Sequence, residues 1–368
     1  MNAIRSEVAP PPPRSPLPND AIHTLVLGDN AADLDAFLNL IADSTGNRRG
    51  CLYVTGRRPA LNEDASGLLC EVSRDGGRTF APCTYNPIAN GAPYQIAGRI
   101  VAALCQRGDF DAAATATCAD GSVGGALSYR MRDVPAAVAS ALRAVSADVL
   151  AKRWILVTHT WPGPSLGCST PSVNMDEVVR GEVVLRIVIP DLRDRPCTLE
   201  GQVRVPKGTW SMIHHVFASL VLADYASAVA RVRIRDAAVK AKPNGTIALF
   251  GPSITDGAHL APLLRVLEQG RAMGQHIVFA TQSMATLGDG DANVAKAIEA
   301  NTGTKVLFNR VGPENGGPLI LGDGEYVVVH DGQKPAPRRL PTDDKLCQMA
   351  RFHANVTPPA PRRGRRSA

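Results

Sequence analysis

Short runs of apolar residues recur along the chain and alternate with longer segments in which apolar positions follow helical periodicity. The runs predicted to form strands are 24–27, 51–55, 154–158, 183–189, 247–250, 277–281, 305–308 and 325–330. The segments predicted to form helices are 36–41, which opens the first helix, and 96–105, 134–149, 212–233 and 260–270. Alternating strands and helices favour a mostly parallel sheet with helices on both faces. The pattern therefore predicts an α/β fold.

Both ends of the chain have compositions that oppose a packed core. Residues 1–20 form a proline-rich leader, and residues 356–368 form a basic tail that contains Arg362, Arg363, Arg365 and Arg366. We expect both ends to be disordered. The four arginines could contact the phosphate backbone of DNA, and a solvated, non-specific terminus is the alternative.

The overall composition is that of a globular protein, with 45% hydrophobic and 20% charged residues in a chain of 368. The net charge of +6 is spread over 40 basic and 34 acidic residues, so it is only a weak sign of nucleic-acid binding. The eight cysteines include no C-x-x-C pair, so we expect no metal site and a reducing cytoplasm. The most apolar helix segment, 212–229, contains His214, His215 and Asp224, which predicts no direct membrane insertion.

Residues 23–41 have the layout of a strand, a phosphate loop and a helix. The phosphate-loop pattern is G-x-x-x-x-G-K-[ST], and only its first glycine, Gly28, is present. The second glycine is replaced by Asp33, the lysine by Leu34, and the hydroxyl residue that holds magnesium by Asp35. An ordinary turn between a strand and a helix, without any nucleotide-binding ancestry, is the alternative interpretation.

These replacements oppose phosphate binding because a phosphate loop works by directing backbone N–H groups and a lysine at the phosphates. Asp29, Asp33 and Asp35 place negative charge in the same segment. One carboxylate about 4 Å from a phosphate costs on the order of 4 kcal/mol at an effective dielectric constant near 20. That cost corresponds to roughly a thousandfold loss of affinity. We therefore expect neither ATP nor magnesium as a cofactor.

The segments 246–253, 259–283 and 300–310 resemble, in this order, the motor region of type IV secretion coupling proteins. These proteins are the TraG/TraD group, within the HerA and FtsK class of hexameric DNA-pumping ATPases. Their motor has a Walker B strand, a helix ending in Gly-Arg, a strand ending in Thr-Gln-Ser and an Asn-Thr-x-Thr-Lys segment. The upstream segments that also resemble this family are 51–58, 85–91 with its Tyr-Asn-Pro, and 219–224.

The resemblance implies a RecA-like domain of the P-loop type, formed by residues 21–105 and 180–345. Residues 106–179 have no counterpart in the family and are predicted to be a partly helical insertion. In the family, the Walker B strand ends in an acidic pair that holds the magnesium shell and orients the attacking water. This chain has Gly251 and Pro252 in those positions, and Asp256 remains open as a substitute metal ligand.

Three further residues match positions that, in the family, sense the nucleotide or reach a neighbouring subunit. Gln282 would be the sensor amide at the end of its strand. The alternative is an amide at a strand end that makes its hydrogen bonds to nearby groups of the protein. Arg271 and Arg310 would be arginine fingers that act in trans on an adjacent active subunit. Surface or ion-paired arginines are the alternative for both.

The ordered motifs and the missing catalytic groups together indicate a pseudo-ATPase related to the coupling proteins. We expect a non-catalytic subunit or accessory factor in type IV secretion or DNA translocation. It would bind protein partners, and it could also contact DNA and form homo- or hetero-oligomers. The alternatives are an active DNA-pumping ATPase with an unconventional nucleotide site, a DNA-binding adaptor that uses its basic tail, and a decaying gene copy.

Overall fold

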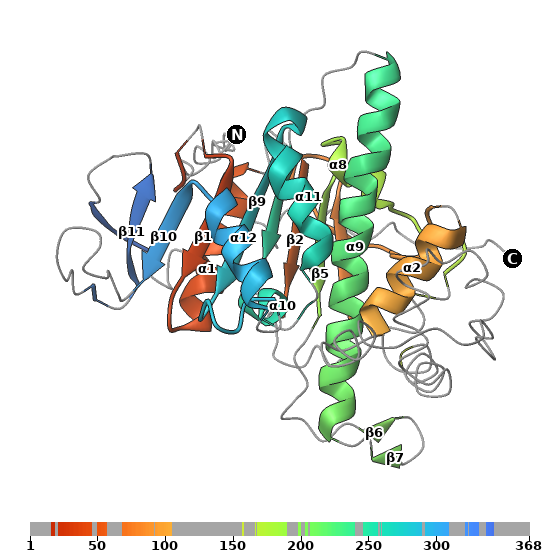
Figure 1. Ribbon diagram of the computed structural model, residues 1–368, viewed down its shortest axis with the longest axis horizontal. Helices are drawn as coiled ribbons and strands as arrows, with labels where there is room; N and C mark the ends of the chain where they lie inside the picture. Colours follow the sequence, from red (N-terminus) through yellow and green to blue (C-terminus); the bar gives the residue numbers. More distant parts are fainter. Residues whose placement is uncertain are drawn as a thin grey trace, which may run out of the picture.

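The computed structural model places much of the chain in one α/β arrangement (Figure 1). It describes residues 16–18, 21–45, 50–56, 68–91, 93–104, 157, 166, 168–189, 198–199, 203–204, 207–239, 246–256, 258, 260–288, 291–308, 321–322, 324–330 and 336–341. The predicted helix at 134–149 and the basic tail at 356–368 lie outside these residues.

The described residues form a ten-stranded sheet in the order β12-β11-β10-β1-β9-β8-β2-β5-β3-β4. The central strands run parallel and are β1 His23–Leu27, β2 Gly50–Thr55, β5 Val184–Val188, β8 Thr246–Phe250, β9 Gln275–Thr281 and β10 Thr304–Phe308. The outer strands run antiparallel and are β3 Leu69–Ser73, β4 Ala81–Pro82, β11 Glu325–His330 and β12 Pro337–Arg339. A separate pair comprises β6 Thr198–Leu199 and β7 Val203–Arg204. The predicted mostly parallel sheet is confirmed.

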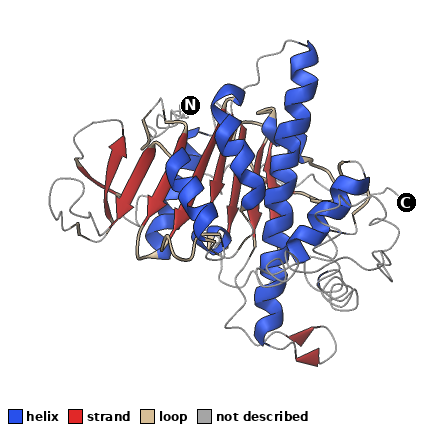
Figure 2. Ribbon diagram, in the orientation of Figure 1, coloured by secondary structure: helices blue, strands red, loops and turns tan. Residues whose placement is uncertain are grey.

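Helices cover both faces of the sheet (Figures 1 and 2). The helix on one face is α1 Ala31–Thr45. The helices that pack on the other face or against its helices are α2 Pro93–Leu104, α8 Met175–Val179, α9 Lys207–Val239, α10 Pro252–Thr255, α11 Ala261–Gln269 and α12 Ala292–Asn301. A 3-10 turn, η2 Gly270–Met273, connects α11 to β9.

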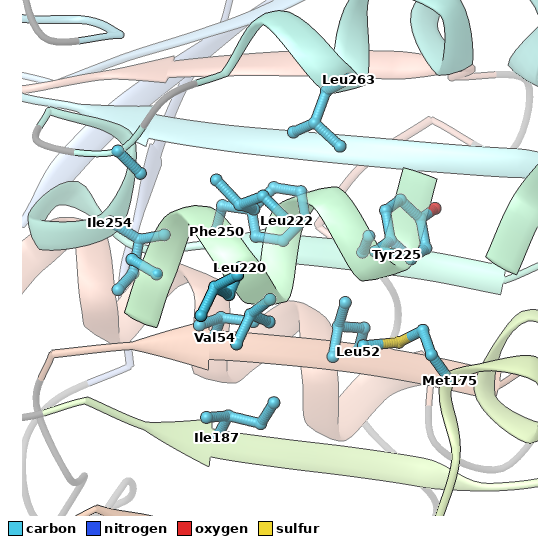
Figure 3. Close-up of a cluster of buried hydrophobic side chains, with 14 of the residues drawn as sticks. Leu52, Val54, Met175, Ile187, Leu220, Leu222, Tyr225, Phe250, Ile254 and Leu263 are labelled. Atoms are coloured by element: carbon cyan, nitrogen blue, oxygen red, sulfur yellow. The ribbon is translucent and has the colours of Figure 1, made fainter. Parts of the chain in front are cut away.

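Two hydrophobic clusters hold the helices against the sheet, one on each face. Because side chains alternate along a strand, Leu52 and Val54 contribute to the cluster beneath α9, whereas Cys51 and Tyr53 contribute to the cluster beneath α1. Figure 3 shows part of the first cluster, where side chains of α9 lie against those of the central strands. Full burial of one such side chain stabilises the fold by about 1.5–3 kcal/mol. This packing fixes which strand ends meet at each edge of the sheet.

The longest described helix, α9, passes the length and composition test for a membrane span over Met212–Arg235. Within the fold, however, 78% of its most apolar 18-residue window is buried. Its apolar residues, among them Phe217, Leu220 and Val221, are fully buried in the cluster on that face of the sheet. Packing against the sheet therefore accounts for the hydropathy of this helix.

Most strand predictions within the described residues are confirmed to within one or two residues. The strand predicted at 154–158 is wrong at Val157, the one residue there that is described, because Val157 is helical. The first helix begins at Ala31, well before the predicted 36. The predicted leader reaches into the core at its end, where Leu17 is buried in the cluster beneath α1. The described last part of the predicted insertion contains α8, which packs against α9 in the main body.

Candidate functional site

The connection between β1 and α1, which aligns with the start of a phosphate loop, is a tight turn of Gly28, Asp29 and Asn30. The Asn30 side chain accepts a hydrogen bond from the backbone N–H of Ala32 at 2.9 Å, which caps the helix. The backbone N–H of Leu34 already donates to the carbonyl of Asn30 at 3.2 Å. The positions that align with Gly-Lys-Ser of a phosphate loop therefore lie within α1, and the N–H of the residue in the lysine position takes part in helical bonding.

Leu34, in the position of the phosphate-loop lysine, is a residue of α1 whose side chain is fully buried in the cluster between this helix and the sheet. It packs against Gly28 so closely that a Cβ atom added there would lie 3.2 Å from Leu34 Cδ2 and 2.8 Å from Phe308 Cβ. Gly28 is thus required by close packing with two apolar side chains. The side chain that would supply a cation to a phosphate is part of the hydrophobic core instead.

Asp35, in the position of the magnesium-binding hydroxyl, lies against the end of β8. Its Oδ1 accepts a hydrogen bond from Thr55 Oγ1 at 3.0 Å, and the residue is 8% exposed. A Cβ atom added at Gly251 would lie 3.0 Å from Asp35 Oδ1 and 3.1 Å from Thr55 Oγ1. The Asp35–Thr55 pair therefore occupies the space into which a Walker B carboxylate would extend from position 251.

Beyond Gly251 the chain forms a short helix rather than an acidic strand end. Gly251 is the N-cap of α10 and Pro252 occupies its first turn. Asp256 ends this helix, and its carboxylate accepts a hydrogen bond from Thr281 Oγ1 at the end of β9. The sequence offered Asp256 as a substitute metal ligand. In the structure, its carboxylate binds a hydroxyl of the neighbouring strand.

Gln282, the candidate sensor amide, lies directly after β9 and reaches the turn after β1. Its Nε2 donates a hydrogen bond to the carbonyl oxygen of Asp29 at 2.9 Å. The backbone N–H of Gly28 donates to the carbonyl of Thr281 at 3.4 Å. These bonds tie the turn to the end of β9. Gly28, Asp35, Gly251 and Gln282 therefore lie at the carboxyl edge of the sheet, where Asp35 binds Thr55 and Gln282 binds the carbonyl of Asp29.

Arg271, one of the candidate arginines, does not join this group. Arg271 lies in η2, before the start of β9, and so at the opposite edge of the sheet from Gln282. Arg310 and the tail arginines Arg362, Arg363, Arg365 and Arg366 lie outside the described residues. Over the part of the chain that is described, no group of three or more His, Cys, Asp or Glu side chains is arranged to hold a metal ion.

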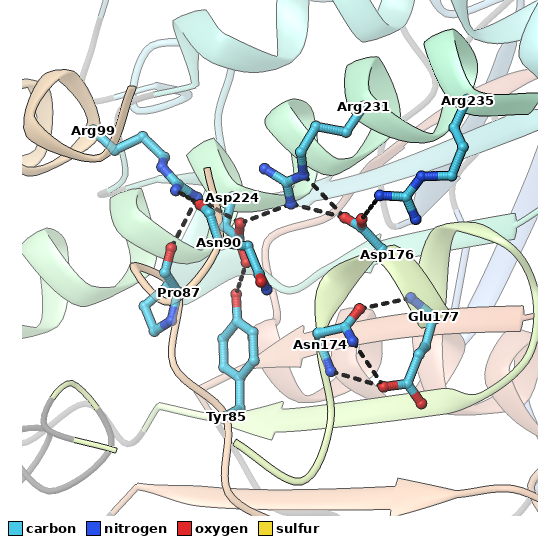
Figure 4. Close-up of polar contacts among 10 residues, drawn as sticks. All are labelled: Tyr85, Pro87, Asn90, Arg99, Asn174, Asp176, Glu177, Asp224, Arg231 and Arg235. Carbon is cyan, nitrogen blue, oxygen red and sulfur yellow. Dashed lines mark hydrogen bonds and ion pairs between the residues drawn. The ribbon is translucent and has the colours of Figure 1, made fainter. Parts of the chain in front are cut away.

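A second polar cluster unites two of the sequence motifs that lie far apart in the chain (Figure 4). Tyr85 of the Tyr-Asn-Pro segment donates a hydrogen bond from its hydroxyl to Asp224 Oδ2 of α9 at 2.9 Å. Arg99 of α2 pairs with Asp224 Oδ1 at 2.5 Å and also binds the carbonyls of Pro87 and Asn90. Arg99 and Asp224 are both buried. This cluster joins α2, α9 and the segment after β4.

Arg231 extends the cluster to α8. It binds Asp176 at 2.8 Å and lies 3.5 Å from Asp224. Burial raises the pKa of Asp224, an effect that the neighbouring Arg99 and Arg231 oppose. Burial also raises the pKa of Tyr85 well above its usual value, with a further contribution from Asp224. The sequence analysis missed both arginines, although Asp224 and Arg231 lie seven residues apart on one helix face and so carry a recognisable spacing.

Comparisons with known proteins give no family model and no curated protein that matches the chain. Two solved structures are similar in fold. One is the bacterial conjugative coupling protein TrwBdeltaN70 in an unbound monoclinic form, with a TM-score of 0.51, 13% identity, and coverage of 88% of this chain and 87% of that one. The other is the plasmid coupling protein TrwB in complex with ADP and Mg2+, with a TM-score of 0.50, 12% identity, and coverage of 87% and 85%. The chain thus has an α/β fold of the RecA-like type.

Proposed function

We propose that this chain is a non-catalytic relative of conjugative coupling proteins. It works as a subunit or accessory factor in a cytoplasmic DNA-transfer or type IV secretion assembly, without binding or hydrolysing ATP. The likeness of its fold to the TrwB coupling proteins and the order of its motifs support the relationship. The occupied carboxyl edge of the sheet supports the absence of catalysis.

The observation that carries the absence of catalysis is that Leu34 and Asp35, in the positions of the lysine and the magnesium-binding hydroxyl, both have internal partners. Leu34 packs in the core, and Asp35 is held by Thr55 in the space beside Gly251. A triphosphate and its magnesium would need a cation, a hydroxyl and a Walker B carboxylate at these positions. To bind there, a nucleotide would have to separate packed side chains and approach the carboxylate of Asp35.

The direct test is ATP turnover by the purified full chain with magnesium, in the absence and presence of single-stranded and double-stranded DNA. We expect phosphate release equal to that of a no-protein control under all of these conditions. Turnover above that control that requires magnesium and increases with DNA would contradict the proposal. It would favour the alternative of an active translocase with an unconventional nucleotide site.

The proposed partners are other proteins of the assembly, with DNA as a further partner, in homo- or hetero-oligomers. The proposed role of Arg271 and Arg310 is to reach the nucleotide of an adjacent active subunit. In that case, adding this chain to an active coupling ATPase should raise its turnover, and replacing either arginine by alanine should remove the increase. Equal stimulation by the two variants and the original chain would show that neither arginine acts in trans.

A further inference from the structure

Two cysteines lie opposite each other at the outer edge of the sheet. β3 and β4 are antiparallel, with Glu71 paired to Pro82 and Val72 paired to Ala81. The same register places Cys83, directly after β4, opposite Cys70 of β3. The backbone N–H of Cys83 donates to the carbonyl of Cys70 at 2.9 Å, which confirms this pairing.

The two thiols lie on the same face of the sheet. Cys70 belongs to the hydrophobic cluster beneath α9, and Cys83 packs against that cluster. Directly opposite residues that share a backbone hydrogen bond have Cα atoms about 5.5 Å apart. A disulfide requires a Cα separation of about 4.4–6.8 Å, so the backbone already has the spacing of a disulfide. Both cysteines are free thiols in this structure.

We propose that Cys70 and Cys83 form a dithiol site that a low-molecular-weight disulfide, such as glutathione disulfide, converts to an intramolecular disulfide. In the first step the thiolate of Cys83, the more exposed of the two, attacks one sulfur of glutathione disulfide and releases one glutathione thiolate. In the second step the thiolate of Cys70 attacks the Cys83 sulfur of the mixed disulfide and releases the second glutathione. The two cysteines lose two protons and two electrons, and glutathione disulfide gains them.

The surroundings make this disulfide slow to form and slow to reduce. Burial and the Glu71 carboxylate raise the pKa of the Cys83 thiol to about 12, and Arg74 opposes the increase. Burial also raises the pKa of Cys70, with further contributions from Cys83 and Glu71. A high pKa lowers the thiolate fraction that attacks, and it also makes each sulfur a poorer leaving group in the reverse reaction. The disulfide would therefore persist after an oxidising episode.

The disulfide would fix the segment that leads from the sheet edge to the buried ion cluster. β4 is exposed and only two residues long. The next residue after Cys83 is Thr84, whose backbone binds Ser172, and then Tyr85, whose hydroxyl binds Asp224. A covalent bond at Cys83 would thus hold the start of the segment that bears Tyr85.

The site can be tested by peptide mapping of the full chain. The protein is incubated with glutathione disulfide at mildly alkaline pH, blocked with N-ethylmaleimide and digested with trypsin without reduction. Arg74 and Arg78 lie between the two cysteines, so trypsin places Cys70 and Cys83 on separate peptides that only a disulfide can join. We expect a joined peptide whose mass is that of the two parts minus two hydrogens, and dithiothreitol should separate it.

Three single cysteine variants test whether the joined peptide comes from Cys70 and Cys83. Cys70→Ser should leave a lasting glutathione adduct on Cys83, Cys83→Ser should give no joined peptide, and Cys168→Ser should behave as the original chain. Near-UV circular dichroism of each variant verifies that it is folded.

In the original chain, oxidation should raise the urea midpoint and slow amide exchange over residues 81–86. A stable glutathione adduct without a joined peptide, unmodified thiols in the folded protein, or joining to another cysteine would each overturn the proposal.

Discussion

The residues that align with a phosphate loop have structural roles in this fold. Leu34 fills core volume where a lysine would have to reach solvent, and Gly28 is small because Phe308 and Leu34 lie against it. Asp35 is on α1 but faces β2, where Thr55 binds it. It is beyond the first helical turn, which contains Asp33. Positions 28 and 34 are therefore held by apolar packing, and position 35 is held by an internal hydrogen bond.

A lysine introduced at position 34, where a phosphate loop has one, should destabilise the fold and should not create phosphate binding. Leu34→Lys places an ammonium group at a fully buried position, so we expect the free energy of unfolding to fall by about 3–5 kcal/mol. Urea denaturation measures the loss, and Leu34→Met, which conserves volume, should cost less than about 1.5 kcal/mol. A Leu34→Lys variant as stable as the original chain would show that position 34 can open to solvent.

His23 should make stability depend on mildly acidic pH. Its Nε2–H donates to the carbonyl of Leu267 at 3.1 Å, and its Nδ1 accepts from the N–H of Ile277 at 3.1 Å, so the neutral ring fits the site. Burial lowers its pKa from 6.5 to about 4, although the bond to Leu267 opposes the shift. Below pH 6.5 the unfolded chain binds a proton that the folded chain does not. Stability contributed by the neutral ring is therefore lost as pH falls from about 6.5 to 4, by roughly 3 kcal/mol.

The measurement compares urea denaturation of the original chain and His23→Gln between pH 7.5 and 4. Carboxylates titrate in both proteins, so the difference between the two curves isolates the histidine. We expect the original chain to lose more stability than the variant over this interval. Parallel curves would show that the folded protein can protonate His23 freely.

At the scale of elements, the ion cluster around Asp224 joins α2, α8 and α9. Asp224 of α9 binds Tyr85 and Arg99, and Arg231 of the same helix binds Asp176 of α8. A buried carboxylate between two guanidinium groups is costly to break, because removal of one partner leaves a buried charge without compensation.

Variants of this cluster should show strong coupling. Asp224→Asn leaves the buried Arg99 without its carboxylate, so we expect a loss of about 3–5 kcal/mol, whereas Tyr85→Phe should cost about 1–2 kcal/mol. The double variant Asp224→Asn with Arg99→Met removes both charges and should be more stable than Asp224→Asn alone. Urea denaturation of the original chain, Asp224→Asn, Arg99→Met and the double variant provides the cycle. Additive losses in the double variant would contradict a coupled pair.

The sequence predicted the central strands well because each is a short apolar run that is buried on both faces, as in β8 and β9. It missed β3, which is only partly buried, and β4, an exposed edge strand of two residues. It also missed α12, although Asp291 caps this helix and Val294, Ala295 and Ile298 lie on its buried face. That cap followed by helically spaced apolar residues was a usable signal.

The candidate site could be predicted in part. Gly28, Gly251 and Gln282 each follow a parallel strand, and the carboxyl ends of parallel strands meet at one edge of a sheet, whereas their role as a site stays a prediction. The early start of α1 depends on Asn30, whose role as a cap was overlooked. The bond between Asp35 and Thr55 depends on how α1 sits over β2, a tertiary arrangement that no local pattern of residues specifies.

At the scale of the whole molecule, the chain has a RecA-like sheet with internal hydrogen bonds at the carboxyl edge of its parallel strands. β1 lies between β10 and β9, and the turn after it is bound to the end of β9 through Gly28 and Gln282. Two of the hydrophobic clusters hold the helices against the two faces of this sheet.

Calorimetric titration of ATP and magnesium into the purified full chain tests this account most directly. The account predicts only heats of dilution at every nucleotide concentration, because Leu34 and the Asp35–Thr55 pair occupy the positions that a triphosphate needs. Saturable heats that disappear when magnesium is chelated would contradict it, and a structure with a nucleotide analogue seated over Gly28 would confirm the contradiction.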